Sequence, residues 1–235
     1  TRERVCINGL WRWQPANPKS SRVPDGGWGH FKVPGCWPGI TDYMQKDSQT
    51  VHPHPSWQGQ KLGAVAAAWY QREIAVPAAW SNRRIAVQIE QLNSFAVAYV
   101  DGKKVGEIQF PAGELDVTSH CRAGGRHVLS LLVVALPLKG VMLSYSDSNS
   151  ARTVLGRVAR RGLCGDVYLA ATPPSARLAD VRVDTSVRKG EVRFDVELHR
   201  LSPDARYTLR AQIREGDRII KTCSSAPFRA ADLGN

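Results

Sequence analysis

Polar and apolar residues alternate at every second position along most of the chain, which is the period of a β-strand. In one stretch Ala96, Ala98 and Val100 occupy one face of an extended chain, and the residues between them occupy the other. Asp101-Gly102 follows, and this dipeptide is typical of tight hairpin turns because both residues tolerate positive φ. The pattern therefore predicts a β-hairpin with a return strand directly after the turn.

Three further segments predict strands in the same way. Residues 69–77 alternate until Pro77 ends the run, and residues 83–92 alternate aliphatic with more polar side chains. Residues 125–137 form a nearly continuous apolar run, which indicates a strand buried on both faces. Helical periodicity is nearly absent, so the sequence predicts an all-β protein built as a sandwich.

Three long segments do not follow this pattern. Residues 14–30 are rich in Pro, Gly and Ser, residues 38–66 show little alternation, and residues 143–162 contain the polar run SYSDSNSAR. Loops of this length are uncommon in compact domains unless they have a function or pack as ordered excursions.

Pro173-Pro174 marks a domain boundary, because proline cannot donate the hydrogen bond that a central strand needs. Residues 1–172 then form one domain and residues 173–235 a smaller one. Three alternating segments predict strands in the second domain: VRVDTSV, EVRFDVEL and YTLRAQI. This domain has about 60 residues, whereas an immunoglobulin-like sandwich usually needs roughly 100. We therefore expect a truncated immunoglobulin-like sandwich.

The chain has 235 residues and a formal net charge of +11, which raises nucleic acid as a partner. The densest basic patch is Arg152, Arg157, Arg160 and Arg161, and no aromatic residue lies among them to stack on bases. A solvated or domain-docking face is the better interpretation of this basic patch, so we expect no nucleic-acid partner.

No apolar run reaches about 18 residues, so we expect no membrane span. The chain has no signal-peptide pattern, but a removed leader stays open, and a periplasmic or extracellular location is slightly favoured.

Cysteine and histidine spacing predicts no metal site and no cofactor. The five scattered cysteines are Cys6, Cys36, Cys121, Cys164 and Cys223. None belongs to a Cys-x-x-Cys pair, so we expect buried free thiols. The pair His52-Pro53-His54 is a poor chelate by itself, and no third ligand is evident. Neither a Gly-x-Ser-x-Gly motif nor a phosphate-binding loop occurs.

Six segments in order form a more specific signal. They are INGLWRWQP (7–15), FKVPGCW (31–37), AWYQREIAVP (68–77), VDGKKVGE (100–107), FPAGELDVT (110–118) and GLCGDVYL (162–169). This series resembles the non-catalytic N-terminal part of family 2 glycoside hydrolases, the group of β-galactosidases, β-glucuronidases and β-mannosidases. Each segment alone is a weak signal, but six in the right order are specific, and they span nearly the whole chain.

The resemblance implies a jelly-roll, sugar-binding-like domain over residues 1–172, followed by the start of an immunoglobulin-like domain over residues 173–235. In the family a TIM barrel then holds both catalytic carboxylates. No barrel is expected in this chain, because it would need roughly 250 more residues. The sequence departs from the family pattern at Cys164 and Gly165, where an aromatic residue and an arginine are usual.

Glycoside hydrolysis needs two carboxyl groups that flank the scissile bond. Asp101, Glu107, Glu114 and Asp116 lie in or beside predicted hairpin strands, so we expect them to be solvated surface acids. The Asn-Glu pair that is characteristic of the family's acid/base is absent. We therefore expect no catalytic residue in this chain and no hydrolysis by the chain alone.

Four residues are candidates for substrate binding. In the family, an acidic residue of a jelly-roll loop reaches into the barrel and hydrogen-bonds a sugar hydroxyl. Asp147 matches that residue, and Asn149 is a similar candidate, whereas the alternative is a turn that binds only its own backbone. Trp37 and Trp57 are candidates for stacking on a sugar ring, with core packing as the alternative.

Three functions stay open on the sequence. The first is the non-catalytic region of a glycoside hydrolase, which buttresses the missing barrel and shapes one wall of its active site. The second is a free-standing carbohydrate-binding module, and the third is a structural interaction domain. The expected partners are a carbohydrate and the C-terminal TIM-barrel domain of the same polypeptide. Self-association through an open sheet edge is a further expectation.

Overall fold

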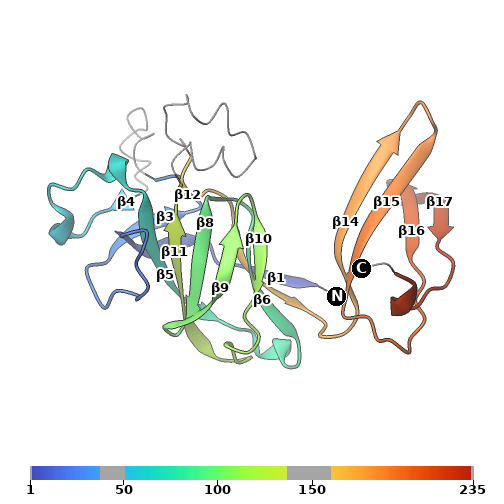
Figure 1. The fold of residues 1–235 in the computed structure, drawn as a ribbon, viewed down its shortest axis with the longest axis horizontal. Coiled ribbons are helices and arrows are strands. Elements are labelled where there is room, and N and C mark those ends of the chain that lie inside the picture. The colour runs from blue at the N-terminus through green and yellow to red at the C-terminus, as the bar shows by residue number, and fades with distance from the viewer. Residues whose placement is uncertain (1, 38–50, 137–159, 234–235) are drawn as a thin grey trace. The chain divides into compact units, whose positions relative to one another are not determined.

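The computed structural model describes residues 2–37, 51–136 and 160–233. The chain divides into two compact units, unit 1 (Thr1–Thr172) and unit 2 (Pro173–Asn235). Both units consist of antiparallel β-strands and short 3-10 helices (Figure 1). The prediction of an all-β protein is therefore confirmed.

Unit 1 is a sandwich of two antiparallel sheets. The four-stranded sheet has the order β1-β13-β6-β10, and the seven-stranded sheet has the order β4-β3-β2-β5-β11-β8-β9. A short third sheet pairs β12 with β7. The strands are β1 (Glu3–Cys6), β2 (Gly9–Pro15), β3 (Gly29–Val33), β4 (Val51–His52), β5 (Ala67–Ala75), β6 (Arg84–Ile89), β7 (Leu92–Asn93), β8 (Phe95–Val100), β9 (Lys103–Gln109), β10 (Gly113–Asp116), β11 (Arg126–Val134), β12 (Gly162–Leu163) and β13 (Val167–Thr172). The 3-10 helices are η3 (Pro55–Trp57), η4 (Leu62–Ala64) and η5 (Ala78–Trp80).

The main apolar core lies between the two large sheets. Val87 and Leu169 of the four-stranded sheet belong to one buried cluster with Trp11, Tyr70 and Leu131 of the seven-stranded sheet. Each large apolar side chain removed from water in this way contributes roughly 1.5–3 kcal/mol. The alternation read from the sequence therefore places the apolar face of each sheet toward the other.

A second apolar cluster covers the outer face of the seven-stranded sheet. It includes Trp69 and Tyr99, and Val23 and Trp28 pack against it. The Tyr99 hydroxyl donates to the carbonyl of Ser21 at 3.3 Å. The long segment rich in Pro, Gly and Ser is thus an ordered excursion over the sheet, and β11 is buried on both faces, as predicted.

The hairpin between β8 and β9 turns at the predicted position. Asp101 and Gly102 have φ values of 49° and 78°, which place both in the left-handed region. The Asp101 carboxylate accepts hydrogen bonds from the Val128 backbone N–H at 2.7 Å and from His127 Nδ1 at 2.7 Å. The turn is therefore fixed to β11 as well as by its own dihedral preferences.

Unit 2 contains two hairpins. They are formed by β14 (Arg177–Ser186) with β15 (Glu191–His199) and by β16 (Arg210–Glu215) with β17 (Arg218–Ser224), and a 3-10 helix, η6 (Ala230–Asp232), follows. β17 does not follow from the alternation pattern, because the adjacent residues Ile219 and Ile220 interrupt it. Tyr207 and Phe228 form an isolated bridge beside the second hairpin.

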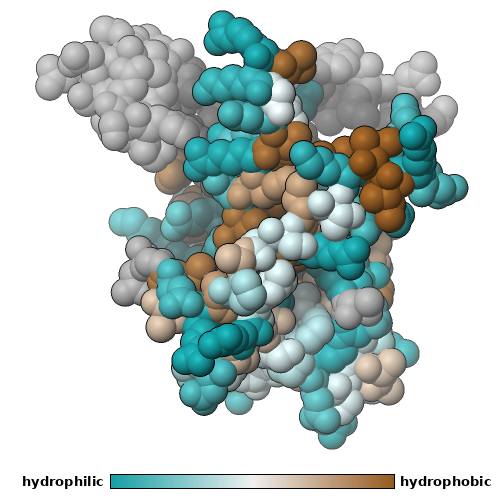
Figure 2. Space-filling view, turned by 90° about the vertical axis from the view of Figure 1, so that its right-hand side faces the viewer, coloured by the Kyte–Doolittle hydropathy of each residue, from teal (hydrophilic) through white to brown (hydrophobic). Residues whose placement is uncertain are grey.

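The apolar residues of unit 2 lie on a sheet face that is open to solvent. In the register of the first hairpin Val183 faces Phe194, and Val181 faces Val196, so these side chains share one face. Phe194 is 37% exposed and Val183 is 50% exposed. Hydrophobic surface is visible between hydrophilic side chains on the face of the molecule in Figure 2.

Candidate functional site

One end of the unit 1 sandwich brings together several residues that the sequence singled out. The backbone N–H of Gly35 donates to the Leu163 carbonyl at 2.8 Å, and that of Trp37 donates to the Arg161 carbonyl at 2.9 Å. β12 pairs with β7, which fixes Leu163 opposite Leu92. Two of the six family-like segments therefore lie side by side at this end, although they are far apart in the chain.

Trp37 closes the core at this end. Its ring is fully buried, and its Nε1–H donates to the Tyr70 hydroxyl. Gly162 makes this approach possible, since a Cβ there would lie 2.6 Å from Trp37 Nε1. Burial raises the pKa of the Tyr70 hydroxyl well above its ordinary value, so Tyr70 stays protonated. The Arg161 guanidinium lies 5.9 Å from the centre of the Trp37 ring.

Trp37 and Trp57, the two candidates for stacking on a sugar ring, follow the core-packing alternative in this structure. Trp37 is 0% exposed and Trp57 is 6% exposed, so neither ring has a face open to a ligand. Trp57 packs edge-on against Trp13 at 5.4 Å, and its Nε1–H donates to the Gly27 carbonyl at 3.1 Å. The sequence could not decide this, because both residues lie in segments without a periodic pattern.

Asp147 and Asn149 lie outside the described residues. The chain leaves the described structure at Leu136 and returns at Arg160, and both positions are fixed to neighbouring residues. The Leu136 N–H donates to Ser94 Oγ at 3.0 Å, and Asn93 Nδ2 donates to the Arg160 carbonyl at 2.8 Å. The segment that contains both candidates therefore starts and ends beside the Asn93-Ser94 pair.

The four acids that we expected on the surface each have a structural partner. Glu107 pairs with Lys104 at 3.0 Å, and Asp116 pairs with Arg84 Nε at 2.8 Å. Glu114 pairs with the same guanidinium, which is only 9% exposed. Asp101 is held at the hairpin turn. Partial burial raises the pKa of Asp116, but its hydrogen bonds with Thr118 and the charge of Arg84 outweigh that effect and lower the pKa overall.

The thiols are more accessible than the sequence indicated. All five cysteines are free, but Cys6 and Cys223 are exposed, so the prediction of buried thiols is wrong for them. Cys6 lies at the end of an edge strand and Cys223 in an exposed hairpin, where no second layer covers them. Cys36, Cys121 and Cys164 are half-buried. Burial raises the pKa of the Cys121 thiol to about 11.

The described residues contain no group of three or more His, Cys, Asp or Glu side chains that could hold a metal ion. His54 instead caps η3, where its Nδ1 accepts from the Ser56 backbone N–H at 3.2 Å. His52 lies opposite His30 in the β3–β4 pair. Within the described ranges, no helix is long and apolar enough to cross a membrane.

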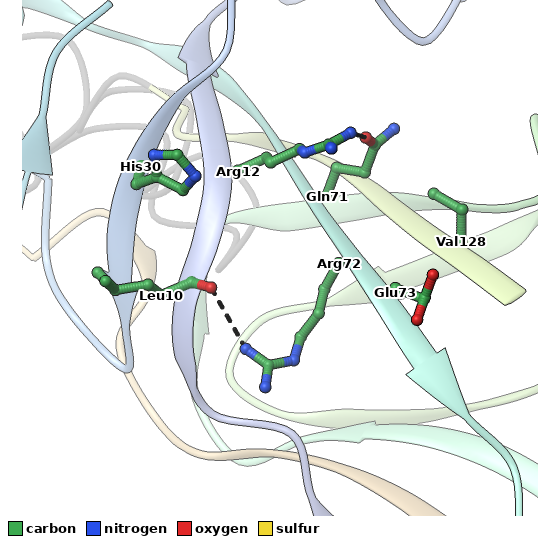
Figure 3. Close-up of a pocket in the computed structure, with 7 residues that line it drawn as sticks. All are labelled: Leu10, Arg12, His30, Gln71, Arg72, Glu73 and Val128. Atoms are coloured by element: carbon green, nitrogen blue, oxygen red, sulfur yellow. Dashed lines mark hydrogen bonds between the residues drawn. The ribbon is translucent and has the colours of Figure 1, made fainter. Parts of the chain in front are cut away.

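A pocket of about 400 Å³ lies on the seven-stranded sheet, between side chains of β2, β3, β5 and β11 (Figure 3). Its lining residues are Leu10, Arg12, His30, Gln71, Arg72, Glu73 and Val128. Arg12 Nη1 donates to Gln71 Oε1 at 3.1 Å, and Arg72 Nη1 donates to the Leu10 carbonyl at 3.4 Å. The lining includes no Trp, Tyr or Phe ring on which a sugar face would stack.

Residues of the family-like segments contact one another directly. Asn8 Nδ2 donates to Asp166 Oδ1 at 2.9 Å, and the Val167 N–H donates to Asn8 Oδ1 at 3.0 Å. Gly106 allows Leu115 to approach, since a Cβ at Gly106 would lie 2.7 Å from Leu115 Cδ1. These segments therefore specify how the sandwich packs, and a resemblance in them is a resemblance in fold.

Comparison with solved structures agrees with the class of fold that this geometry defines. No family model matches the sequence. A β-glucuronidase from Ruminococcus gnavus matches 97% of this chain with a TM-score of 0.67 at 13% identity, and 39% of that chain is covered. A β-glucuronidase from an uncultured Clostridium sp. matches 97% with a TM-score of 0.62 at 18% identity, and 38% of it is covered.

A third similar structure is the Bifidobacterium dentium β-glucuronidase complexed with coumarin-3-O-glucuronide. It matches 95% of this chain with a TM-score of 0.64 at 17% identity, and 40% of it is covered. The likeness shows that both units share the fold of part of these enzymes. The chain spans about two fifths of the length of the solved β-glucuronidases that it matches.

Proposed function

We propose that this chain is the non-catalytic N-terminal region of a family 2 glycoside hydrolase, followed by a TIM barrel in the same polypeptide. The observation that supports this most is the fold shared over 97% of this chain with only 39% of a β-glucuronidase. The unmatched part of that enzyme is longer than this chain, so it has room for a barrel of roughly 250 residues. The order of the six family-like segments supports the same assignment.

The proposed role of the region is to buttress the barrel. For that role unit 2 would first need to be a complete sandwich. The β14–β15 hairpin supports such completion, because its apolar face is open and its opposite face has cross-strand neighbours of opposite charge. Arg182 lies opposite Asp195, and Asp184 lies opposite Arg193. A sheet with one apolar and one charged face is stable when its apolar face is covered. Further strands of the same sandwich, supplied by the rest of the polypeptide, are the proposed cover.

We also propose that Asp147 shapes one wall of the active site by accepting hydrogen bonds from a sugar hydroxyl, with Asn149 beside it. The anchors of their segment at Leu136 and Arg160 are held next to Asn93 and Ser94. Such anchoring gives the segment a fixed base, which a positioning contact needs. Asp147 then acts by holding the substrate in place, without transferring a proton.

A free-standing carbohydrate-binding module is the second candidate function, and the pocket on the seven-stranded sheet is the observation that favours it. Its two guanidinium groups, from Arg12 and Arg72, suit an acidic sugar. Three features weigh against this candidate. The Glu73 carboxylate also lines the pocket, no Trp, Tyr or Phe ring does, and Arg12 and Arg72 already bond to Gln71 and Leu10. We therefore prefer the enzyme region.

The first test compares the 235-residue chain with the longer polypeptide encoded by its gene. We expect the gene to continue past Asn235 into a (β/α)8 pattern. The longer protein should hydrolyse a nitrophenyl β-glucuronide, β-galactoside or β-mannoside, and the 235-residue chain should hydrolyse none. A gene without a barrel, together with binding of a sugar by the chain alone, would support the module instead.

The second test is Asp147→Asn in the longer polypeptide. Loss of a charge-assisted hydrogen bond should lower kcat/KM roughly 10- to 1000-fold, which is about 1.4–4 kcal/mol, with the fold unchanged. Asp25→Asn is the matched control, because Asp25 is an exposed acid whose Arg22 pair lies at 3.0 Å on the surface. Full activity of Asp147→Asn would remove the substrate role and leave the turn-forming alternative.

A further inference from the structure

Two thiols that are distant in sequence meet at the Trp37 end of unit 1. The Cys36 thiol donates to the Cys164 sulfur at an Sγ–Sγ distance of 3.6 Å. Both side chains are half-buried, so a small oxidant can reach them. A disulfide has an S–S bond of roughly 2.05 Å, so closure needs the sulfur atoms to approach by about 1.5 Å. Rotation about the two Cα–Cβ bonds is the movement that closure would use.

The backbones on both sides of the pair are held in place. Gly35 and Trp37, the neighbours of Cys36, donate to the carbonyls of Leu163 and Arg161 at 2.8 and 2.9 Å. The Cys164 N–H donates to the Gln91 carbonyl at 2.9 Å. The adjacent Gly165 N–H donates to the same carbonyl at 2.9 Å. The two sulfur atoms are therefore kept next to each other by the fold and do not meet by chance fluctuation of loose segments.

We propose that Cys36 and Cys164 are a redox-active thiol pair that closes into an intrachain disulfide when the protein meets an oxidising disulfide such as oxidised glutathione. The proposal does not depend on the enzyme assignment. The pair joins the 31–37 and 162–169 segments at the end of unit 1 where Trp37 is buried. Closure would fix this end of the sandwich covalently, and reduction would release it.

The exchange balances as two substitutions at sulfur. A Cys36 thiolate attacks one sulfur of oxidised glutathione, forms a mixed disulfide and releases one glutathione thiolate. Cys164, after losing its proton, attacks the Cys36 sulfur and releases the second glutathione. The two cysteine sulfur atoms are oxidised, two glutathione molecules are the reduced products, and they take up the two protons.

Ionisation of Cys164 depends on the state of Cys36. Burial and a charge on the adjacent Cys36 raise the pKa of the Cys164 thiol, whereas Arg160 lowers it. Once Cys36 is in a mixed disulfide, it carries no thiolate charge to oppose ionisation of Cys164. Attack in the opposite order, by Cys164 first, would give the same disulfide.

The test uses the full 235-residue chain with Cys6→Ser and Cys223→Ser, which removes the two exposed thiols. The protein is incubated with oxidised and reduced glutathione, alkylated and mapped as unreduced peptides by mass spectrometry. We expect a peptide that links Cys36 to Cys164, with Cys121 alkylated as a free thiol. The loop closed by this bond spans 128 residues. Oxidation should raise the Tm by roughly 5–15 °C, and dithiothreitol should reverse the rise.

Cys36→Ser and Cys164→Ser should each abolish both the linked peptide and the Tm rise. Cys121→Ser is the matched control, because Cys121 is also half-buried but has no neighbouring thiol within the described residues. This variant should keep both the linked peptide and the Tm rise. Alkylation of both Cys36 and Cys164 in folded, oxidised protein would overturn the proposal. Stable glutathione adducts on Cys36 without a link to Cys164 would overturn it too. Peptide mapping of the chain that carries only Cys6→Ser and Cys223→Ser tests the proposal even if one of the further variants fails to fold.

Discussion

Unit 1 and unit 2 both show alternation in sequence but differ in what covers their apolar faces. In unit 1 the two large sheets enclose one apolar cluster, and the Pro/Gly-rich segment covers a second. In unit 2 none of the described residues, from Pro173 to Leu233, is buried. Alternation therefore predicts where a strand lies and which of its faces is apolar. Whether that face becomes a core depends on a second layer.

The difference has a physical consequence for stability. A two-stranded hairpin buries too little apolar surface to offset the entropy lost on ordering its chain. The sandwich of unit 1 buries tryptophan, tyrosine and leucine side chains completely. We therefore expect unit 2 to depend on a cover from outside the hairpins, whereas unit 1 is stable through its own core.

The largest effect should come from deleting a core side chain of unit 1. Leu131→Ala removes a side chain that is 0% exposed and should lower the free energy of unfolding by about 2–5 kcal/mol. Urea unfolding followed by tryptophan fluorescence measures it, since all seven tryptophans lie before residue 172. Phe194→Ala in unit 2 is the matched change at a side chain that is 37% exposed, and it should leave this transition unchanged.

A loss of about 2 kcal/mol or more in Phe194→Ala would mean that the open face of unit 2 is covered by unit 1 in solution. Hydrogen exchange gives an independent comparison. Amides of β15 should exchange through local opening, much faster than amides of β11. Equal protection in dilute protein would contradict the difference between the two units.

The second effect separates glycines with crowded surroundings from glycines in open space. Gly162 has φ +100°, and an added Cβ would lie 2.6 Å from Trp37 Nε1 and 2.7 Å from the Tyr70 hydroxyl. Gly162→Ala should therefore cost about 2–4 kcal/mol through backbone strain and overpacking. Tryptophan fluorescence in urea measures this loss directly.

Gly102→Ala is the matched control within unit 1, because Gly102 also has positive φ, at +78°, but has no atom near an added Cβ. It should cost only about 1 kcal/mol. Gly190 in unit 2 also has open space around an added Cβ, with φ +64°. Its alanine variant should change only the amide hydrogen exchange of the β14–β15 hairpin. Equal losses for Gly162→Ala and Gly102→Ala would argue against the close packing of Trp37 and Tyr70.

The smallest effect concerns the carboxylate at the hairpin turn of unit 1. Partial burial raises the pKa of Asp101, but the Val128 N–H and His127 outweigh that effect and lower the pKa overall. A lowered folded-state pKa stabilises the protein above the unfolded pKa of about 3.9 and loses this effect as pH falls through the folded value. Asp101→Asn keeps the turn and should lower the free energy of unfolding by about 0.5–1 kcal/mol at pH 7. This difference from the unsubstituted protein should close below about pH 4.

Asp184→Asn is the control in unit 2, where Asp184 pairs with Arg182 at 3.3 Å on an exposed surface. It should have no measurable effect at any pH, because exposed ion pairs contribute little. Urea titrations of both variants between pH 3 and pH 7 provide the comparison. If the difference in unfolding free energy between Asp101→Asn and the unsubstituted protein stays constant over this range, the carboxylate charge is not what stabilises the turn.

The sequence by itself determined the strands of the clearly alternating segments, the hairpin turn at Asp101-Gly102 and the doubly buried strand β11. These follow from local patterns, because side-chain alternation and turn dihedrals are properties of neighbouring residues. The order of six segments also pointed to the fold. Their residues contact each other across the sandwich, as Asn8 and Asp166 do at 2.9 Å. Strand β17 was missed because Ile219-Ile220 hides its period.

Only the tertiary structure decided which residues that are distant in sequence are in contact, and which apolar faces are buried. Trp37 and Trp57 are core residues, because β-strands far away in the chain provide the walls around their rings. Cys36 and Cys164 are neighbours at 3.6 Å although 128 residues separate them. The same applies to the open face of unit 2, whose pattern equals that of a buried sheet. Local alternation determines which side chains point together, but burial and long-range contacts depend on how whole sheets pack, which no single segment of the sequence specifies.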